Sequence, residues 1–132
     1  LPNFLVKGVS AALQKTSAKV AFVINLMTKL GQTYGFTAKD FVNELEKYAQ
    51  RLPDLVLIDS KKYPQEILEL YKAEGGAPVV DNLTNEDFLV VRENISSDLV
   101  YEKPKGDMLK RSLIRHDPDK LAWELMKYLK PF

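Results

Sequence analysis

Two short apolar runs, at residues 20–24 and 55–58, most constrain what this chain can fold into. The first reads Val-Ala-Phe-Val-Ile and the second Leu-Val-Leu-Ile, and neither contains a polar residue. A strand with one face in water alternates apolar and polar side chains, whereas a parallel strand covered on both faces does not. The two runs therefore predict two parallel strands, each buried on both faces.

Helical patterns lie on either side of the first run. Residues 3–16 carry apolar side chains at helical spacing, which predicts an amphipathic helix that covers the sheet. Thr37 and Asp40 have the spacing of a capping box at the start of a second helix, and Pro53 ends that helix.

The pattern continues after the second run. Pro64 suits the first turn of a third helix, which Gly75 and Gly76 close. Residues 77–80 predict a third strand, and residues 88–92 a weaker one. Strands that alternate with helices in this way are joined by right-handed crossovers. The expected fold class is therefore α/β, a three-layer Rossmann-like domain with a mostly parallel sheet.

The end of the chain predicts one more strand and one more helix. Residues 112–114 could form a short strand, and Asp117 with Pro118 have the chemistry of a helix start. The residues expected to face the core from this last helix are Leu121, Ala122, Leu125 and Leu129.

Composition excludes several classes of function. A chain of 132 residues is expected to form one domain, over residues 1–132. Its net charge of +1 gives no global field for nucleic acid, and the lack of cysteine excludes disulfide frameworks, thiolate zinc sites and cysteine nucleophiles. No apolar run approaches the ~18 residues needed to cross a bilayer, so we expect no membrane insertion and a cytoplasmic location.

A polar loop at residues 25–36 follows the first predicted strand. It is far longer than the roughly 2 to 6 residues of a simple connection, and long loops in compact domains tend to be functional. Gly31 and Gly35 would let the backbone approach a ligand or adopt positive φ. The loop lies before a helix start whose free amides would favour an anion. It predicts a small-anion or nucleotide site, although a plain connection would have the same position.

Other chemistry is limited by the residues available. His116 is the only histidine, so a histidine-rich metal site and ordinary hydrolase chemistry are unexpected. Arg115 is suited to bidentate binding of phosphate, or else to a surface ion pair, and basic residues outnumber acidic ones across residues 101–116. Carboxylates for a divalent metal could come from Asp40, Asp59, Asp81 and Asp117, but helix capping explains two of them.

Three motifs in this order resemble those of the YvcK-type gluconeogenesis factors, a branch of the CofD-like group. They are Asn-Leu-Met-Thr at residues 25–28 with the Gly-Phe-Thr-Ala run at 35–38, Gly-Ala-Pro-Val at 76–79, and Arg-His-Asp-Pro at 115–118. The sequence departs from the family pattern at Leu30, Gln32 and Phe41. The opening Leu1-Pro2-Asn3 resembles the segment after the family's glycine-rich loop, so the chain is expected to be the carboxyl-terminal half of a longer fold, incomplete on its amino-terminal side.

The resemblance implies a bacterial protein that binds UDP-activated sugars such as UDP-N-acetylglucosamine. It would support cell shape and wall synthesis during growth on gluconeogenic carbon sources, and it would have no catalytic residues or resident metal. Tyr71 would contact the nucleotide-sugar and Arg115 would hold its phosphates, although Tyr71 also fits the apolar face of its helix. The matched ligand-binding positions are Asn25, Thr28, Gly31, Thr33, Gly35, Thr37, Tyr71 and Arg115.

Two alternatives remain open. Enzymes of the CofD branch are transferases that join phospholactate to a deazaflavin precursor with a divalent metal. The chain could also be a non-binding fragment that packs on a partner, and an oligomer is possible. The Asn-Leu-Met-Thr motif belongs to the regulatory branch, which favours binding of a nucleotide-sugar over catalysis.

Overall fold

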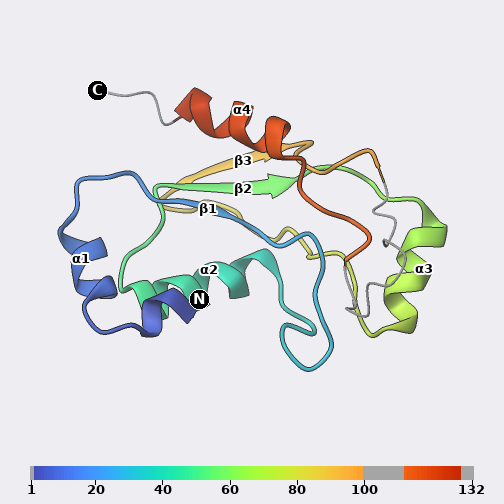
Figure 1. Cartoon of the computed structure of the whole chain (residues 1–132), viewed down its shortest axis with the longest axis horizontal. Helices are drawn as coiled ribbons and strands as arrows, with labels where there is room; N and C mark the ends of the chain where they lie inside the picture. The colour runs from blue at the N-terminus through green and yellow to red at the C-terminus, as the bar shows by residue number, and fades with distance from the viewer. Residues whose placement is uncertain (1, 100–111, 129–132) are drawn as a thin grey trace, which may run out of the picture.

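Three parallel strands form the sheet at the centre of the computed structural model, which describes residues 2–99 and 112–128 (Figure 1). The strands lie in the order β1 (Ala21–Val23), β2 (Leu55–Asp59), β3 (Leu89–Glu93). Ala21 pairs with Leu55, and Leu55 pairs in turn with Leu89. The parallel pairing confirms the predicted α/β class.

Helices cover both faces of this sheet. Figure 1 shows α2 (Ala38–Ala49) on one face and α4 (Pro118–Tyr128) on the other, while α3 (Gln65–Ala73) lies beyond the carboxyl ends of the strands. α1 (Val9–Lys15) and the short helix η1 (Pro2–Leu5) pack beside α2. In this three-layer arrangement the loops that follow the strands lie at the carboxyl end of the sheet.

The central strand β2 explains why its sequence has no polar position. Val56 and Ile58 belong to the core cluster that contains α2, whereas Leu55 and Leu57 belong to the cluster against which α4 packs. Successive side chains of a strand point to opposite faces, so two covered faces require an uninterrupted apolar run. The strand predicted at residues 55–58 is confirmed.

The strand β1 is less buried than predicted. Its three residues are only half-buried, because β2 is its sole pairing partner among the described residues and β1 lies at the sheet's edge. Burial becomes complete just after it, at Ile24, whose N–H donates to the Leu57 carbonyl at 3.0 Å. The predicted run therefore ends in the core, at the point where the polar loop begins.

The third strand of the sheet is β3, and the prediction that residues 77–80 fill this place was wrong. Pro78 has no N–H for a strand ladder, and this segment instead borders the loop after β1. The Val79 N–H donates to the Leu26 carbonyl at 3.1 Å, and the Thr28 N–H to the Ala77 carbonyl at 2.7 Å. The weaker strand prediction at 88–92 was the better one.

The predicted helix over residues 3–16 is broken in two and does not cover the sheet. Gly8 adopts a left-handed conformation with φ of 93°, which separates η1 from α1. Ser10 of α1 donates to the Ala49 carbonyl at the end of α2 at 3.0 Å, and Leu5 is 71% exposed. This region therefore packs against α2, one layer away from the strands.

The start of α4 and the end of α3 were predicted more accurately than the first helix was. Asp117 caps α4 by accepting the N–H groups of Asp119 and Lys120, each at 3.0 Å. At the end of α3, Gly75 has φ of 71° and the Gly76 N–H donates to the Tyr71 carbonyl at 2.8 Å, the Schellman pattern.

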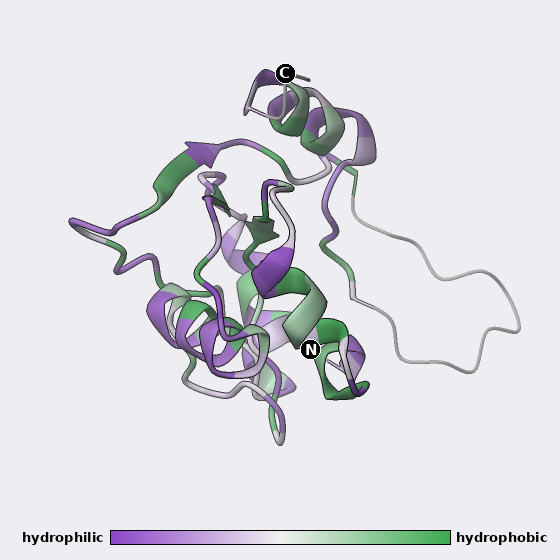
Figure 2. Ribbon diagram, turned by 90° about the vertical axis from the view of Figure 1, so that its left-hand side faces the viewer, coloured by the Kyte–Doolittle hydropathy of each residue, from purple (hydrophilic) through white to green (hydrophobic). Residues whose placement is uncertain are grey.

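The last helix packs through one side only. Leu121 and Leu125 pack against the buried cluster that contains Leu55 and Leu57 of β2 and Val91 of β3. Ala122, which was predicted to face the core, is exposed. Leu129 lies outside the described residues. α4 carries both hydrophobic and hydrophilic residues (Figure 2), and Trp123 on its outer side is 69% exposed. Nowhere in residues 2–99 and 112–128 is there a helix with the length and apolar composition that a membrane span requires.

The strand predicted at residues 112–114 was also wrong. These residues form a bend, and the pairing begins two residues later, where His116 forms an antiparallel bridge with Ser96. The Ser97 N–H donates to the Arg115 carbonyl at 2.9 Å and the Asp117 N–H to the Ile95 carbonyl at 2.8 Å. This short antiparallel pairing joins the residues before α4 to the residues that follow β3.

Candidate ligand-binding site

The loop at residues 25–36 folds into compact turns at the carboxyl end of β1. The N–H of Thr33 donates to the Lys29 carbonyl at 2.9 Å, and the N–H of Phe36 to the Thr33 carbonyl at 3.0 Å. Gly31 and Gly35 have φ of 77° and 76°, in the region that favours glycine. These two glycines shape the loop, and neither lines a cavity described below.

A cavity of about 820 Å³ opens between this loop, the end of α3 and the segment 112–116. We call it the polar cleft. It brings together five of the eight predicted ligand-binding residues, and omits Gly31, Gly35 and Thr37. The five are Asn25, Thr28, Thr33, Tyr71 and Arg115.

The hydroxyl groups of Thr28 and Thr33, two of the predicted ligand-binding residues, accept hydrogen bonds from backbone N–H groups. Thr28 is 5% exposed, and its hydroxyl accepts the Ala77 N–H at 3.0 Å. The Thr33 hydroxyl accepts the Lys29 N–H at 3.0 Å. Asn25 differs, because it is exposed and its side chain makes no hydrogen bond with the described residues. Asn25 and the exposed Gln32 are the side-chain amides of the loop that line the cleft.

The start of α2 does not provide the free amides expected from the sequence. Thr37 and Asp40 form the predicted capping box, in which the Asp40 carboxylate accepts the Thr37 N–H at 2.8 Å. The Ala38 N–H donates to the Val80 carbonyl at 2.9 Å, and the Lys39 N–H to the Asn82 side chain at 3.0 Å. Protein acceptors therefore occupy this helix terminus, and Thr37 is a cap.

Tyr71 forms part of the wall of the polar cleft and fixes its opposite side. It is half-buried on α3, and its hydroxyl accepts the Ile114 N–H at 3.0 Å. A side chain at Gly76 would come within 3.0 Å of the Thr28 carbonyl oxygen and 3.4 Å of the Tyr71 ring. The close packing here joins α3, the loop and the segment that carries Arg115.

The cations of the polar cleft are Lys29 and the exposed Arg115, beside His116. Burial lowers the pKa of His116 below its ordinary value, against the opposing influence of the Asp59 carboxylate and the Ile24 carbonyl. Its Nε2 is buried and has no hydrogen-bond partner among the described residues. The cleft thus combines the cationic side chains of Lys29 and Arg115 with an imidazole whose pKa is lowered by burial. Most of the basic segment that precedes Arg115 lies outside the described residues.

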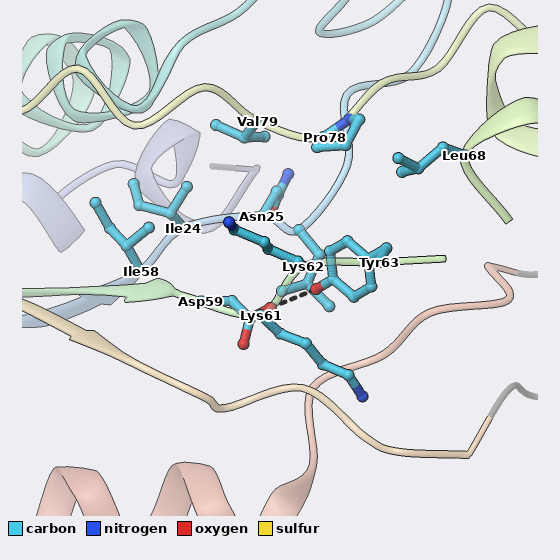
Figure 3. A pocket seen from close by; sticks show the side chains of 11 residues that line it. Ile24, Asn25, Ile58, Asp59, Lys61, Lys62, Tyr63, Leu68, Pro78 and Val79 are labelled. Carbon is cyan, nitrogen blue, oxygen red and sulfur yellow. Dashed lines mark hydrogen bonds between the residues drawn. The ribbon is translucent and has the colours of Figure 1, made fainter. Parts of the chain in front are cut away.

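A second cavity of about 400 Å³, which we call the apolar compartment, lies at the carboxyl ends of β1 and β2 (Figure 3). It shares Asn25 and Leu26 with the polar cleft. The other side chains that line it are Ile24, Ile58, Asp59, Lys61, Lys62, Tyr63, Leu68, Pro78 and Val79. The motifs in the sequence do not indicate this compartment, although polar residues directly after a buried strand are a signal that could have predicted it.

Asp59 and Tyr63 form the polar end of the apolar compartment. The Tyr63 hydroxyl donates to Asp59, whose other oxygen accepts the N–H groups of Ile95 at 2.9 Å and Ser96 at 3.0 Å. Burial, together with that hydrogen bond, raises the pKa of Tyr63 above its ordinary value. Asp59 therefore joins the ends of β2 and β3.

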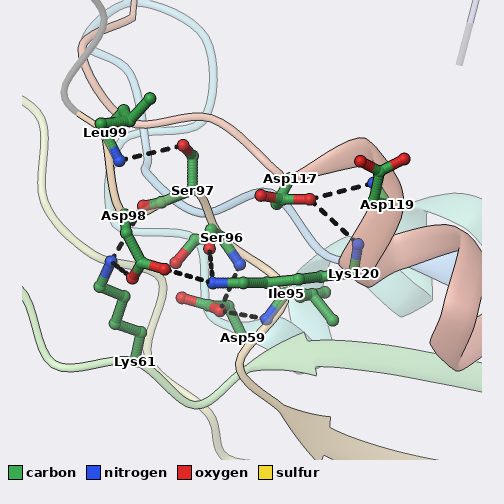
Figure 4. Close-up of polar contacts among 10 residues, drawn as sticks. All are labelled: Asp59, Lys61, Ile95, Ser96, Ser97, Asp98, Leu99, Asp117, Asp119 and Lys120. Atoms are coloured by element: carbon green, nitrogen blue, oxygen red, sulfur yellow. Dashed lines mark hydrogen bonds and ion pairs between the residues drawn. The ribbon is translucent and has the colours of Figure 1, made fainter.

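An ion cluster extends this connection to α4 (Figure 4). Asp98 accepts from Lys61 and from Lys120, each at 2.8 Å, and the two lysines also donate to the carbonyls of Ser97 and Ser96. Lys120 and then Lys61 hold the pKa of Asp98 at about 2, well below its ordinary value.

The four carboxylates considered for a metal do not come together. Asp40 and Asp117 cap helices, Asp59 binds two backbone amides, and Asp81 binds Arg92 and the Leu83 N–H. Within residues 2–99 and 112–128, no three acidic or histidine side chains form a group that could hold a metal ion. The described residues do not fit the divalent metal of the transferase alternative.

Parallel strands with helices on both faces and two cavities at their carboxyl ends define a Rossmann-like α/β domain. Residues 1–96 match the sequence model of the family described as "2-phospho-L-lactate transferase CofD". The chain belongs to this family, which confirms the CofD-like assignment made from its motifs.

Within the family, the chain is similar to gluconeogenesis factors. It is 38% identical to a Thermotoga maritima protein assigned to them, over 92% of this chain and 37% of that protein. It is 32% identical to the gluconeogenesis factor of Bacillus subtilis, over 98% of this chain and 39% of that protein. The chain thus spans well under half of these relatives.

The fold is shared with a solved structure. A member of the UPF0052 family from Bacillus halodurans superposes with a TM-score of 0.79 at 20% identity, over 95% of this chain and 37% of that protein. This likeness concerns the fold alone.

Proposed function

We propose that the polar cleft binds a UDP-activated sugar, such as UDP-N-acetylglucosamine, and that the chain acts in a cytoplasmic regulator of the gluconeogenesis factor type. In this role it would support cell shape and wall synthesis during growth on gluconeogenic carbon sources. Binding of the nucleotide-sugar, and not its chemical conversion, is the proposed activity.

The observation that carries the proposal is the convergence of distant residues on one cavity. Asn25, Tyr71 and Arg115 come from three separate segments and line the same cleft. Its volume of about 820 Å³ lies within the range of small-molecule sites. A guanidinium beside hydroxyl and amide groups is the chemistry that binds a diphosphate linked to a sugar.

The local charge favours an anion although the chain is nearly neutral. Lys29 and Arg115 line the cleft, whereas Glu74 is its single acidic lining residue among those described. The total net charge is only +1, so the attraction must be local.

Calorimetric titration of UDP-N-acetylglucosamine and UDP-glucose into the longest available form of the protein tests the proposal. Arg115→Ala should weaken binding more than tenfold, about 1.4 kcal/mol, because a charge-assisted hydrogen bond is lost. Tyr71→Ala should also weaken binding, since it removes a wall of the cleft.

Arg92→Ala is the matched control. It removes the same charge from a guanidinium that binds Asp81 and the Leu83 carbonyl, outside both cavities. It should leave the affinity unchanged. Absence of heat with either ligand, from protein shown by circular dichroism to be folded, would contradict the proposal.

A second candidate is phospholactate transfer, favoured by the description of the matched family. Product formation from phospholactate and a deazaflavin precursor, in the presence of a divalent metal, would replace the regulator proposal. A folded protein with neither binding nor turnover would point to the remaining alternative, a chain that packs on a partner.

A further inference from the structure

We infer that the apolar compartment is the subsite for the base of the ligand, and that Asn25 and Lys62 select uracil there. The inference rests on the proposed function. It divides the ligand between two neighbouring cavities that share Asn25 and Leu26, with the diphosphate and sugar in the polar cleft.

The linings of the two cavities differ in polarity. In the apolar compartment the planar ring of Tyr63 and the aliphatic side chains of Leu68, Pro78 and Val79 provide apolar contact surfaces (Figure 3). A nucleobase is flat and carries no charge, so it loses less hydration on entering such a compartment than a diphosphate does. The volume of about 400 Å³ also lies within the range of small-molecule sites.

Most charged side chains of the apolar compartment already have partners within the described residues. Asp59 is bound by Tyr63 and by two backbone amides, and Lys61 is bound by Asp98. Lys62 is the exception, because it makes no hydrogen bond or ion pair with the described residues. One ammonium can bind a carbonyl oxygen of a base, whereas a diphosphate is better matched by the cations of the polar cleft.

Asn25 lines both cavities. Its carboxamide offers both donors and an acceptor, which complement the adjacent N–H and C=O groups of a uracil ring. The backbone on either side is fixed, because Ile24 donates to Leu57 and Leu26 accepts from Val79 at 3.1 Å. The backbone of Asn25 is therefore fixed at the boundary of the two cavities, where base and diphosphate would meet.

Lys62 can distinguish uracil from cytosine, whereas Asn25 cannot. The Asn25 amide can rotate to match either ring, so it recognises a pyrimidine edge without choosing between them. Lys62 only donates, and it favours the carbonyl oxygen that uracil has where cytosine has an amino group. Discrimination between the two bases should therefore depend on Lys62, and affinity for both on Asn25.

Titration of UDP and CDP into the protein and its variants tests this division. The wild-type protein should prefer UDP. Asn25→Ala should weaken UDP binding about tenfold, as expected for loss of one or two hydrogen bonds. Lys62→Met, which keeps most of the length of the side chain and removes the ammonium group, should bring the UDP and CDP affinities close to equality. Arg115→Ala should weaken both nucleotides by the same factor and leave their ratio unchanged.

The outcomes distinguish this inference from the proposed function. If UDP binds but Lys62→Met keeps the wild-type ratio, or Asn25→Ala keeps the wild-type affinity, the base does not occupy the apolar compartment. If Lys62→Met lowers both affinities equally, Lys62 binds phosphate and the inference is wrong. If neither nucleotide nor UDP-N-acetylglucosamine binds, the proposed function fails first.

Discussion

At the scale of single residues, Thr28 anchors the loop to the segment 77–80. Its hydroxyl accepts the Ala77 N–H from a nearly buried position. Thr28→Val keeps the shape but leaves that amide without an acceptor, so we expect it to lower the free energy of unfolding by about 1 to 3 kcal/mol. Denaturant titration would measure this. Thr33→Val, at a more exposed hydroxyl, should cost less. Equal stability of wild type and Thr28→Val would contradict the anchoring role.

At the scale of elements, the capping box of α2 contributes stability and not ligand affinity. Thr37→Ala should lower the free energy of unfolding by about 1 kcal/mol, because the cap of the helix is lost. Thr37→Ser keeps the hydroxyl and should retain most of the stability. Both variants should bind UDP-N-acetylglucosamine as the wild type does, since Val80 and Asn82 already occupy the first amides of α2. If Thr37→Ala bound UDP-N-acetylglucosamine more weakly and kept the wild-type stability, Thr37 would be a ligand-binding residue and not a helix cap alone.

At the scale of the whole molecule, Asp98 joins the ends of β2 and β3 to α4. The pKa of Asp98 is lowered to about 2, so its stabilising contribution is present above its ordinary value of 3.8 and is lost as pH falls through about 2. Wild type should therefore be more stable than Asp98→Asn at pH 7, and the difference should shrink below about pH 4. Thermal unfolding of both proteins across this range would show it, and a constant difference would exclude the charged form as the cause.

Local sequence patterns predict individual strands and helix caps of this molecule. They do not predict which distant segments pair in the sheet. The apolar run at residues 55–58 and the cap at Asp117 depend on neighbouring residues alone, and both are present. Which segment pairs with β2 depends on residues far apart, so the sequence favoured residues 77–80 over 88–92. Tyr71 and Arg115 meet Asn25 only through the fold. Their shared cleft was implied by resemblance, and no local spacing indicates it.

The backbone that borders the polar cleft is already bonded on both sides. The loop is joined to the segment 77–80, and the segment 112–116 is held by Tyr71 and by its pairing with residues 95–97. The conformational entropy of these described walls has thus been lost on folding, and a ligand would order mainly exposed side chains such as that of Asn25. A preorganised site of this kind converts more of each contact into affinity. It also tolerates misfit poorly, so such a cleft favours discrimination among similar molecules over adaptation to many.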